Sequence, residues 1–324
     1  MLSASWRGEI LGVREFVGSH YKHFNAGELA RCAESLHGFL NQGGRLMITL
    51  AGAMSTAEIG RSLGPAIREH KVHAICCTGA NLEEDLFSLI ARSAYEALPE
   101  WREMNANDDA ALRDKGMNRV TDVAIPEEVI NTIEKPLMEL WEGAEAVGDR
   151  RFPHEYLYDL LLHGDMEFGS NHDFSWLMAA ADANLPIFTP GWEDSTLGSL
   201  LAARVLDCSL KGPDIVKSGL QAMQALADWY REDDSPTGIL QVGGGIAGDF
   251  AISVVPMLRN DAKVDVPLWS WFAQISESRP SYGGYSGAPP NEKISWGKLD
   301  VDTPRFVIES DATIVLPLLL SALE

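Results

Sequence analysis

Short apolar runs alternate with amphipathic stretches along most of this 324-residue chain, and this alternation restricts the fold more than any other feature. Six runs are short, apolar and mostly followed by Gly, Ser, Thr or Asp, which is typical of buried strands. They cover residues 45–51, 72–78, 185–189, 238–242, 264–271 and 305–309. Between them the pattern predicts helices over 26–41, 55–69, 82–98, 126–146, 171–183, 196–210, 213–230, 246–258 and 312–323. Strand–helix alternation predicts an α/β fold with a doubly wound, mainly parallel sheet and helices on both faces.

The chain shows no internal repeat and no low-complexity linker. We therefore expect one large α/β domain over residues 26–324, preceded by an N-terminal arm, residues 1–25. Polar segments at 101–116, 231–237 and 276–291 are expected to be loops. The last of these is the longest, and a long loop in a compact domain is often functional.

The charge balance excludes one class of partner. With 26 Lys and Arg against 47 Asp and Glu, the net charge is −21, whereas phosphate binding needs clustered basic residues. Nucleic acid is therefore not expected, and the charge favours cationic small molecules or serves solubility alone. The apolar segment 312–323 is too short to cross a membrane. Because Arg7, Glu9 and Arg14 interrupt the first residues, no signal peptide is expected, and we predict a cytoplasmic protein without a membrane span.

Cysteine and histidine usage gives no metal or redox pattern. The four cysteines form neither CxxC nor a disulfide framework, so we expect small buried side chains in a reducing compartment; they are Cys32, Cys76, Cys77 and Cys208. All eight histidines lie at or before His172, without metal-ligand spacing. No metal site is predicted.

Ligands of parallel α/β sheets bind beyond the carboxyl ends of the strands, and four segments stand there. Gly243–Gly248 satisfies GxGxxG between a predicted strand and a predicted helix. Glycines let the backbone approach a pyrophosphate, and the helix N-terminus offers free N–H groups. A plain glycine turn into a helix explains the motif equally well.

Acidic residues mark the second and third segments. Thr78–Asp85 ends a strand and opens a helix with three acids. These acids either stabilise the helix dipole or form a carboxylate pair that awaits a cation. In the third segment, Asp194–Gly198, Asp194 or Ser195 is either a helix N-cap or, for Asp194, a ribose-binding acid.

The fourth segment, Glu292–Lys298, places a lysine beside Trp296 and Gly297. Partial desolvation there would favour the neutral amine, which is a nucleophile toward imines and carbonyls. An ordinary surface lysine is the alternative.

In this order the four segments resemble deoxyhypusine synthase, from about Arg45 to the C-terminus. The most specific matches are LEED at 82–85, GGG at 243–245, EKISWGK at 292–298 and the Ser-Asp-Ala at 310–312. The resemblance implies a Rossmann-like NAD-binding fold. It also implies homotetramers with active sites at dimer interfaces.

In that family NAD oxidises the aminobutyl amine of spermidine to an imine, which a lysine captures. A second amine then takes over the butyl group, and NADH reduces the product. The resemblance implies that Lys298 forms the imine, that Trp296 flanks the substrate and that Glu292 holds an ammonium group. Glu83 and Glu84 fall where the family binds the polyamine and the cofactor ribose. Positions that contact NAD in the family are matched by Ala53, Met54, Ser55, Thr56, Thr78, Gly79, Ala80, Asp194, Thr196, Gly244, Asp311 and Ala312.

The departures from the family lie in the substrate pocket. Where the family has a histidine pair after the GGG loop, this chain has Asp249 and Phe250, and Tyr285 and Ser199 replace polyamine-binding acids. We therefore expect a divergent branch that transfers an aminobutyl or guanidinobutyl group to a small amine such as putrescine or agmatine, with Asp249 facing a guanidinium. The alternatives are a true deoxyhypusine synthase that modifies a lysine of a translation factor, and a non-catalytic protein that binds NAD or polyamine.

Overall fold

A six-stranded sheet runs through the middle of the molecule. The computed structural model describes residues 12–169, 172–280, 283–284 and 287–323. The sheet has the order β6-β2-β1-β7-β8-β9, and every neighbouring pair is parallel. Its strands are β1 (Arg45–Leu50), β2 (Ala74–Cys77), β6 (Ile187–Phe188), β7 (Thr237–Val242), β8 (Trp271–Ile275) and β9 (Arg305–Ile308). The predicted α/β fold with a parallel sheet is confirmed.

The strand order reverses once. From β1 the chain adds β2 and then β6 on one side, and it then crosses to the other side of β1 to add β7, β8 and β9. This is the strand order of doubly wound dinucleotide-binding sheets. The reversal opens a crevice outside the carboxyl ends of β1 and β7, where ligands of such sheets bind.

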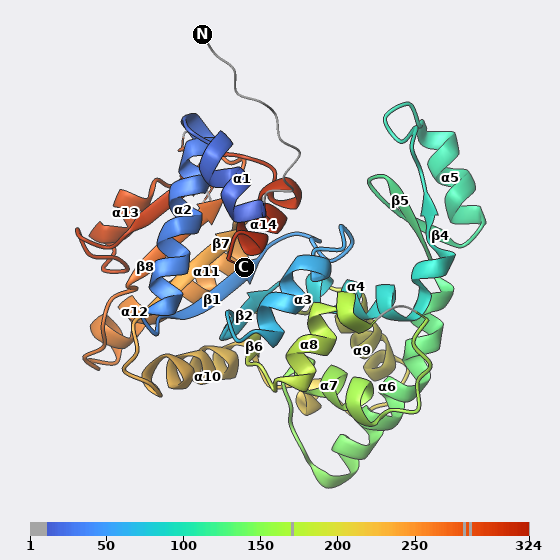
Figure 1. Cartoon of the computed structure of the whole chain (residues 1–324). Coiled ribbons are helices and arrows are strands. Elements are labelled where there is room, and N and C mark those ends of the chain that lie inside the picture. The colour runs from blue at the N-terminus through green and yellow to red at the C-terminus, as the bar shows by residue number, and fades with distance from the viewer. Residues whose placement is uncertain (1–11, 170–171, 281–282, 285–286, 324) are drawn as a thin grey trace.

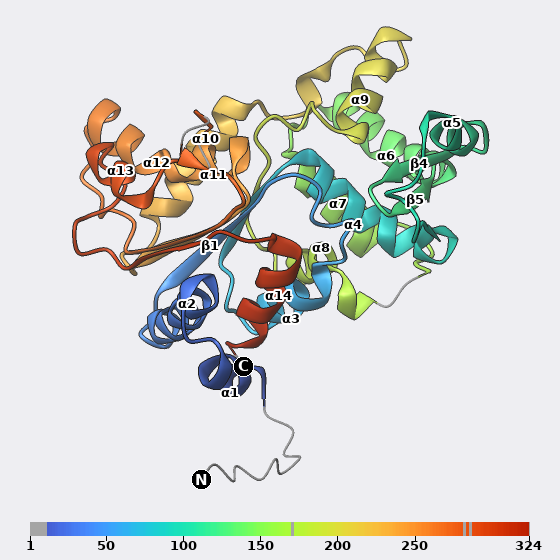
Figure 2. The ribbon, with the colours of Figure 1, turned by 90° about the horizontal axis from the view of Figure 1, so that it is seen from above.

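Helices cover both faces of the sheet (Figures 1 and 2). On one face α2 packs against β8 and β9 and α14 packs against β8, and on the other face α11 packs against β1, β2 and β7. The helices are α1 (Val13–His20), α2 (Phe24–Asn41), α3 (Gly60–Arg68), α4 (Gly79–Ala91), α5 (Ala106–Asp114), α6 (Glu128–Val147), α7 (Pro153–His163), α8 (Trp176–Asp182), α9 (Thr196–Leu206), α10 (Gly219–Arg231), α11 (Gly245–Ile252), α12 (Val254–Pro256), α13 (Pro290–Ser295) and α14 (Ala312–Ser321). Among the described residues no helix is both long and apolar enough to cross a bilayer.

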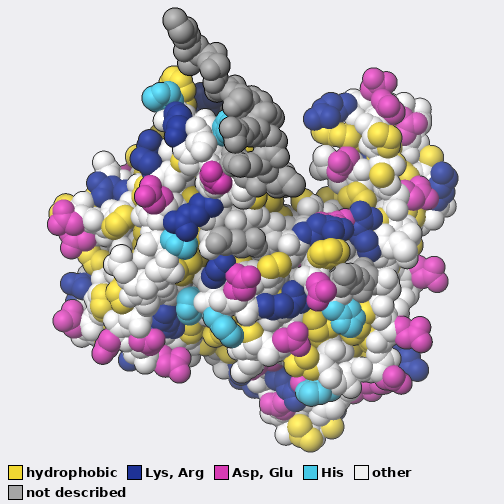
Figure 3. All heavy atoms as spheres, in the orientation of Figure 1, with side chains coloured by type: hydrophobic (Ala, Val, Ile, Leu, Met, Phe, Trp, Pro, Cys, Tyr) yellow, Lys and Arg dark blue, Asp and Glu magenta, His cyan; other side chains and the backbone are white. Residues whose placement is uncertain are grey.

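A second, smaller sheet projects from the main body. The strands β3 (Glu96–Ala97), β4 (Met117–Val120) and β5 (Val123–Pro126) form an antiparallel sheet in the order β3-β5-β4, and α5 accompanies it. Its far end stands apart from the body in the space-filling view (Figure 3). The loop predicted over 101–116 is wrong, because Asn105 and Asp108 form a capping box that starts α5.

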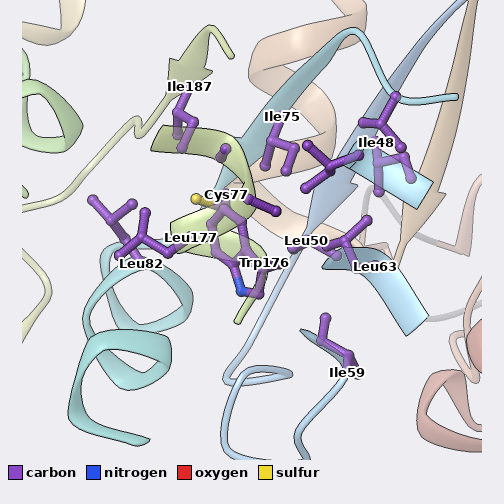
Figure 4. Packing of buried hydrophobic residues seen from close by; sticks show 14 of the residues in the cluster. Ile48, Leu50, Ile59, Leu63, Ile75, Cys77, Leu82, Trp176, Leu177 and Ile187 are labelled. Atoms are coloured by element: carbon purple, nitrogen blue, oxygen red, sulfur yellow. The ribbon is translucent and has the colours of Figure 1, made fainter. Parts of the chain in front are cut away.

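Two apolar cores sandwich the main sheet, since successive side chains of a strand point to opposite faces. Leu46, Ile48 and Leu50 of β1 belong to the larger core, whereas Met47 belongs to the smaller one under α10–α12. Figure 4 shows part of the larger core, in which Trp176 and Leu177 lie between Leu82 and Leu50. Each core packs one layer of helices against the sheet. In each layer a helix begins at the edge where the strands end, α14 in one and α11 in the other.

Further sequence predictions need correction. The strand expected over 264–271 is β8 at Trp271–Ile275, because Pro267 has no N–H for a sheet ladder. The helix expected over 82–98 begins at Gly79, where the Thr78 side chain caps it. The structure also contains α1, α7 and α13, which the apolar periodicity did not reveal. Cys208 is exposed rather than buried, while the other three cysteines are buried as expected.

Candidate active site at the carboxyl edge of the sheet

Five strands of the sheet end at one level. The backbone N–H of Thr78 donates to the Leu50 carbonyl at 3.2 Å, and that of Ala51 donates to the Val242 carbonyl at 3.0 Å. On the far side, the N–H of Gly243 donates to the Ile275 carbonyl at 2.8 Å. The predicted cofactor-contacting segments 53–56, 78–80, 244 and 311–312 follow these strand ends. The structure therefore brings them to the same edge of the sheet.

The loops after β1 and β7 touch each other at the reversal point. Gly243 has φ +77°, and a Cβ added to it would lie 2.8 Å from the Cβ of Ala51. The next turn is open, since a Cβ on Gly245, at φ +62°, would meet no atom within 4 Å. Gly244 is the N-cap of α11 and provides no side-chain cap. The first N–H groups of α11 thus meet an open glycine turn, which fits the pyrophosphate of a dinucleotide.

Asn81 holds the loop after β1 in place. It is fully buried, and its Nδ2 donates to the carbonyls of Ala51 and Gly52 at 3.1 and 2.8 Å. Its Oδ1 accepts from the N–H of Ser55 at 3.1 Å, and the Thr78 hydroxyl donates to the Gly52 carbonyl at 2.7 Å. Sequence reasoning missed Asn81, although its place directly before the predicted helix at 82–98 and after a buried strand was a signal.

The three consecutive acids of α4 have three different partners. Glu83 is 4 % exposed, and its two carboxylate oxygens accept from the N–H groups of Thr196 and Leu197, both at 2.8 Å. Burial raises the pKa of Glu83, and these hydrogen bonds oppose the rise. Since α4 begins at Gly79, the acids lie beyond its first turn and do not cap their own helix. Glu83 instead caps α9, and its assignment as a polyamine ligand stays a prediction.

Glu84 is the least buried of the three acids. It accepts a hydrogen bond from the Thr56 hydroxyl of the loop after β1. Burial raises the pKa of Glu84 to about 7, and the neighbouring charge of Glu83 adds to the rise. Asp85, by contrast, is buried and accepts from the Ser175 hydroxyl and the Leu177 N–H. A half-buried carboxyl such as Glu84 can hold a ribose hydroxyl or an ammonium group.

The segment before α9 shows whether Asp194 or Ser195 caps this helix. Ser195 is the N-cap of α9, and its hydroxyl oxygen accepts from the Gly198 N–H at 3.0 Å. Asp194 is therefore not the cap and lies exposed. A Cβ added to Gly191 in the same loop would lie 3.1 Å from Cδ1 of Ile246, so this loop reaches the start of α11.

Lys298 is a buried amine with a carboxylate partner. The residue is 7 % exposed, and its Nζ lies 3.2 Å from Oδ1 of Asp249 on α11. Nζ also lies 6.0 Å from the centre of the Trp296 ring, which is 68 % exposed. Glu292 is exposed in the first turn of α13. The pairing of Asp249 with Lys298 was not expected, because the two residues are far apart in sequence.

A second buried lysine lies beside this group. Lys293 is 2 % exposed, and its Nζ donates to the Ala288 carbonyl at 3.2 Å. Nζ lies 5.1 Å from the centre of the Phe272 ring. Burial, followed by the charge of Lys298, lowers the pKa of Lys293 to about 8. Burial of this residue could not be predicted from the sequence, because a lysine in a short helix normally faces solvent.

The remaining predicted residues lie in different surroundings. Asp311 is the N-cap of α14 and accepts from the N–H and hydroxyl of Thr313 at 2.7 and 2.8 Å. Ala312 is buried directly after it. Tyr285 lies outside the described residues. Within the described part of the chain, no three His, Cys, Asp or Glu side chains gather as a metal site would require.

Known proteins are similar to this chain in sequence and in fold. A "Deoxyhypusine synthase-like protein" of Cyanothece sp. is 28% identical, over 95% of this chain and 78% of its own length. "Probable deoxyhypusine synthase 2" of Methanosarcina mazei is also 28% identical, over 86% of this chain and 76% of its own. A crystal structure described as that of a deoxyhypusine synthase from Entamoeba histolytica superposes with a TM-score of 0.58, covering 96% of this chain and 92% of that one. At 14% identity it shows the shared fold alone.

The family model described as deoxyhypusine synthase matches residues 18–323. The match begins well before Arg45, where the recognisable motifs start. The chain belongs to the deoxyhypusine synthase family.

Proposed function

We propose that this protein is an NAD-dependent transferase that moves an aminobutyl or guanidinobutyl group from a polyamine to an acceptor amine. The observation that carries the proposal is the buried amine of Lys298, 3.2 Å from the Asp249 carboxylate. Asp249 stands on α11, the same helix whose first turn follows Gly244 at the reversal of the sheet. One short helix thus links the dinucleotide-type turn to the reactive amine.

Binding of NAD is supported by the residues at this edge. The open glycine turn and the N–H groups of α11 suit the pyrophosphate, and Glu84 or Asp194 would hold ribose hydroxyls. The loop at 53–56, held by Asn81, would complete the cradle. When bound, NAD accepts a hydride from the substrate carbon next to nitrogen and later returns it.

Lys298 performs the transfer in this account. Its neutral amine attacks the carbon of the substrate imine, and the C–N bond to the leaving amine breaks. The proton lost from the lysine nitrogen passes to the departing nitrogen, and the Asp249 carboxylate lies within hydrogen-bonding reach of Lys298 to carry it. The acceptor amine repeats the exchange and frees Lys298.

Carboxylates at this edge suit a small, multiply cationic substrate. Glu84 and Asp249 can each pair with an ammonium or guanidinium group. Where the family has a histidine pair after the GGG loop, this chain has Asp249 and Phe250. All eight of its histidines lie at or before His172. This replacement favours a small amine as acceptor. A protein lysine is the second candidate, favoured by the name of the Methanosarcina mazei relative.

An amine screen tests the proposal. The protein is incubated with NAD and one donor (spermidine, putrescine or agmatine), together with an isotope-labelled acceptor amine, and products are identified by mass. We expect a labelled acceptor enlarged by the donor's four-carbon unit, formed only with NAD. Lys298→Ala should abolish the product. Lys211→Ala should not, because that lysine's side chain is 86% exposed. Tight NAD binding without conversion of any amine would contradict the proposal, and conversion only of a protein lysine would select the second candidate.

The variant Asp249→Asn distinguishes guanidino donors from simple diamine donors. If its carboxylate faces a guanidinium, Asp249→Asn should reduce turnover of agmatine more than that of putrescine. Unchanged agmatine turnover together with slower oxidation of simple diamines would contradict this assignment.

A further inference from the structure

A groove opens at the amino edge of the main sheet, where the strands begin, opposite the candidate active site. One hollow of about 740 Å³ lies between the start of α7, β6 and α10, and a second of about 520 Å³ reaches Arg45 at the start of β1. Residues 184–186, Trp229 and Glu232 line both hollows, which together are here called the amino-edge groove. None of the described residues predicted for the candidate active site lines it.

Arg45 is a buried cation with an unused hydrogen-bond donor. It is 8 % exposed, its guanidinium carbon lies 4.3 Å from the centre of the Trp229 ring, and its Nη2 donates to the Trp229 carbonyl at 3.2 Å. Its Nη1 has no hydrogen-bond partner among the described residues. Asp233 lines the same hollow, but its carboxylate accepts from the Ser235 N–H at 2.8 Å. Because a buried donor without an acceptor is costly, a carboxylate in this hollow would stabilise Arg45.

His154 lines the larger hollow and has a second unpaired atom. The residue is 8 % exposed, and its Nδ1 has no hydrogen-bond partner among the described residues. Burial, followed by the charge of Lys217, lowers the pKa of His154 to about 3, so the ring is neutral at physiological pH. In the tautomer that carries its proton on Nε2, Nδ1 accepts a hydrogen bond from an N–H group of a ligand.

The charges around the amino-edge groove distinguish between classes of ligand. Glu232 lines both hollows and is exposed. Glu155 and Asp228 line the larger hollow, and each pairs with a neighbouring basic residue. A simple anion would therefore suit Arg45 but would be repelled by Glu232, and a simple amine would leave Nη1 of Arg45 without an acceptor. A ligand with both a carboxylate and a cationic group suits both residues.

We propose that the amino-edge groove binds a basic α-amino acid, whose carboxylate pairs with Arg45 and whose cationic side chain lies in the larger hollow near Glu232 and His154. The planar guanidinium group matches a carboxylate in geometry. Phe152, Phe188 and Trp229 line the larger hollow, and aromatic faces attract cations. This site is independent of the proposed transferase, because none of its residues takes part in that reaction.

Calorimetric titration without NAD or an amine donor measures the binding. L-Arginine and L-lysine should bind, whereas agmatine and cadaverine, which lack only the carboxylate, should bind this groove at least about tenfold more weakly. Norleucine lacks only the side-chain ammonium group of lysine and should also bind more weakly. Hydrogen exchange locates the site, since arginine should slow exchange at residues 183–187 and 226–233 and leave residues 243–248 unchanged.

Variants assign the contacts. Arg45→Gln should weaken arginine binding about tenfold or more, and Arg45→Lys should weaken it less. His154→Phe keeps an aromatic ring without Nδ1 and should weaken binding severalfold. Glu232→Gln, at an exposed position that leaves the fold intact, should weaken lysine binding severalfold and leave norleucine binding unchanged. Asp234→Asn removes the same charge from an exposed residue that does not line the groove, and should bind as the parent does.

Binding of agmatine in the groove as tightly as arginine would overturn the inference. So would slowed exchange confined to residues 243–248, no binding of either amino acid up to about 10 mM, or equal affinity in the parent and in folded Arg45→Gln and Glu232→Gln. The titration contains neither NAD nor a donor amine. Failure of the transferase would therefore leave amino acid binding intact, and absence of that binding would leave the transferase intact.

Discussion

Glu84 and its neighbours show what single residues contribute. All three are acids in one short run, yet Glu83 caps α9, Glu84 accepts a hydrogen bond from Thr56, and Asp85 accepts one from the Ser175 hydroxyl. The run could be found in the sequence because it follows a predicted strand. The partner of each acid could not be predicted, because the partners come from α9, the loop after β1 and the start of α8. The same limit explains why the pairing of Lys298 with Asp249 was missed.

Stability should depend on the ionisation of Glu84. Its pKa is raised from 4.5 to about 7 in the folded protein, so its favourable contribution is present below pH 4.5 and is lost as the pH rises through 7. Glu84→Gln removes this loss. We expect its free energy of unfolding to exceed the parent's by about 2 kcal/mol at pH 8 and to match it near pH 4. Urea unfolding across this range measures the difference. The exposed Glu100→Gln should follow the parent, and a constant gap for Glu84→Gln at all pH values would contradict the account.

At the scale of elements, the reversal of the sheet at β1 and β7 positions the candidate site. The strand–helix alternation predicted the parallel sheet, and the GxGxxG segment predicted the turn after β7. The antiparallel sheet of β3, β4 and β5 escaped prediction, because its strands are only two to four residues long and carry little apolar periodicity. The displaced β8 shows that an apolar run containing Pro267 can pack against a core without joining a ladder.

The contact between Gly243 and Ala51 can be isolated. Gly243→Ala adds a methyl group 2.8 Å from the Ala51 Cβ at φ +77°, so we expect a loss of about 2–4 kcal/mol in the free energy of unfolding. Gly245→Ala has the same backbone strain but open space around it, and should cost only about 1–2 kcal/mol. Ala51→Gly combined with Gly243→Ala should recover the difference, as a double-mutant cycle in urea would show. No recovery would show that the loss of stability in Gly243→Ala does not come from its contact with Ala51.

At the scale of the molecule, apolar side chains remain exposed around the candidate site. Trp296 is 68 % exposed, and Ile246 and Ile314, each in the first turn of a helix that follows the sheet, are 52 % and 61 % exposed. The resemblance implied homotetramers with active sites at dimer interfaces, and this assembly stays a prediction. The sequence could not place an interface, because exposure is known only once the chain is folded.

Activity should therefore depend on assembly. We expect a homotetramer in sedimentation velocity, and we expect specific activity to fall on dilution in parallel with dissociation. Trp296→Glu should weaken assembly, since a buried charge at an interface is costly. Val301→Glu, at a residue that is 64 % exposed in the turn before β9, serves as a comparison outside the site. A monomer with full activity would contradict the shared-site expectation.

Net charge adds a long-range effect. On the face drawn in Figure 3 acidic and basic side chains are interspersed, so the charge of −21 acts mainly as an overall field. Such a field attracts cationic substrates and is screened by salt. We expect kcat/KM for a polyamine to fall severalfold between 20 and 300 mM salt, on the order of the screening of exposed charges, while kcat changes little. An unchanged kcat/KM would show that substrate capture is entirely local.

The most direct measurement of the central claim is chemical trapping at Lys298. The protein is incubated with NAD and spermidine, putrescine or agmatine, reduced with borohydride and digested, and the peptides are weighed. We predict a four-carbon amine adduct on Lys298 that requires NAD and disappears in Lys298→Ala. An adduct on another lysine, or none with any amine while NAD is bound, would contradict the account.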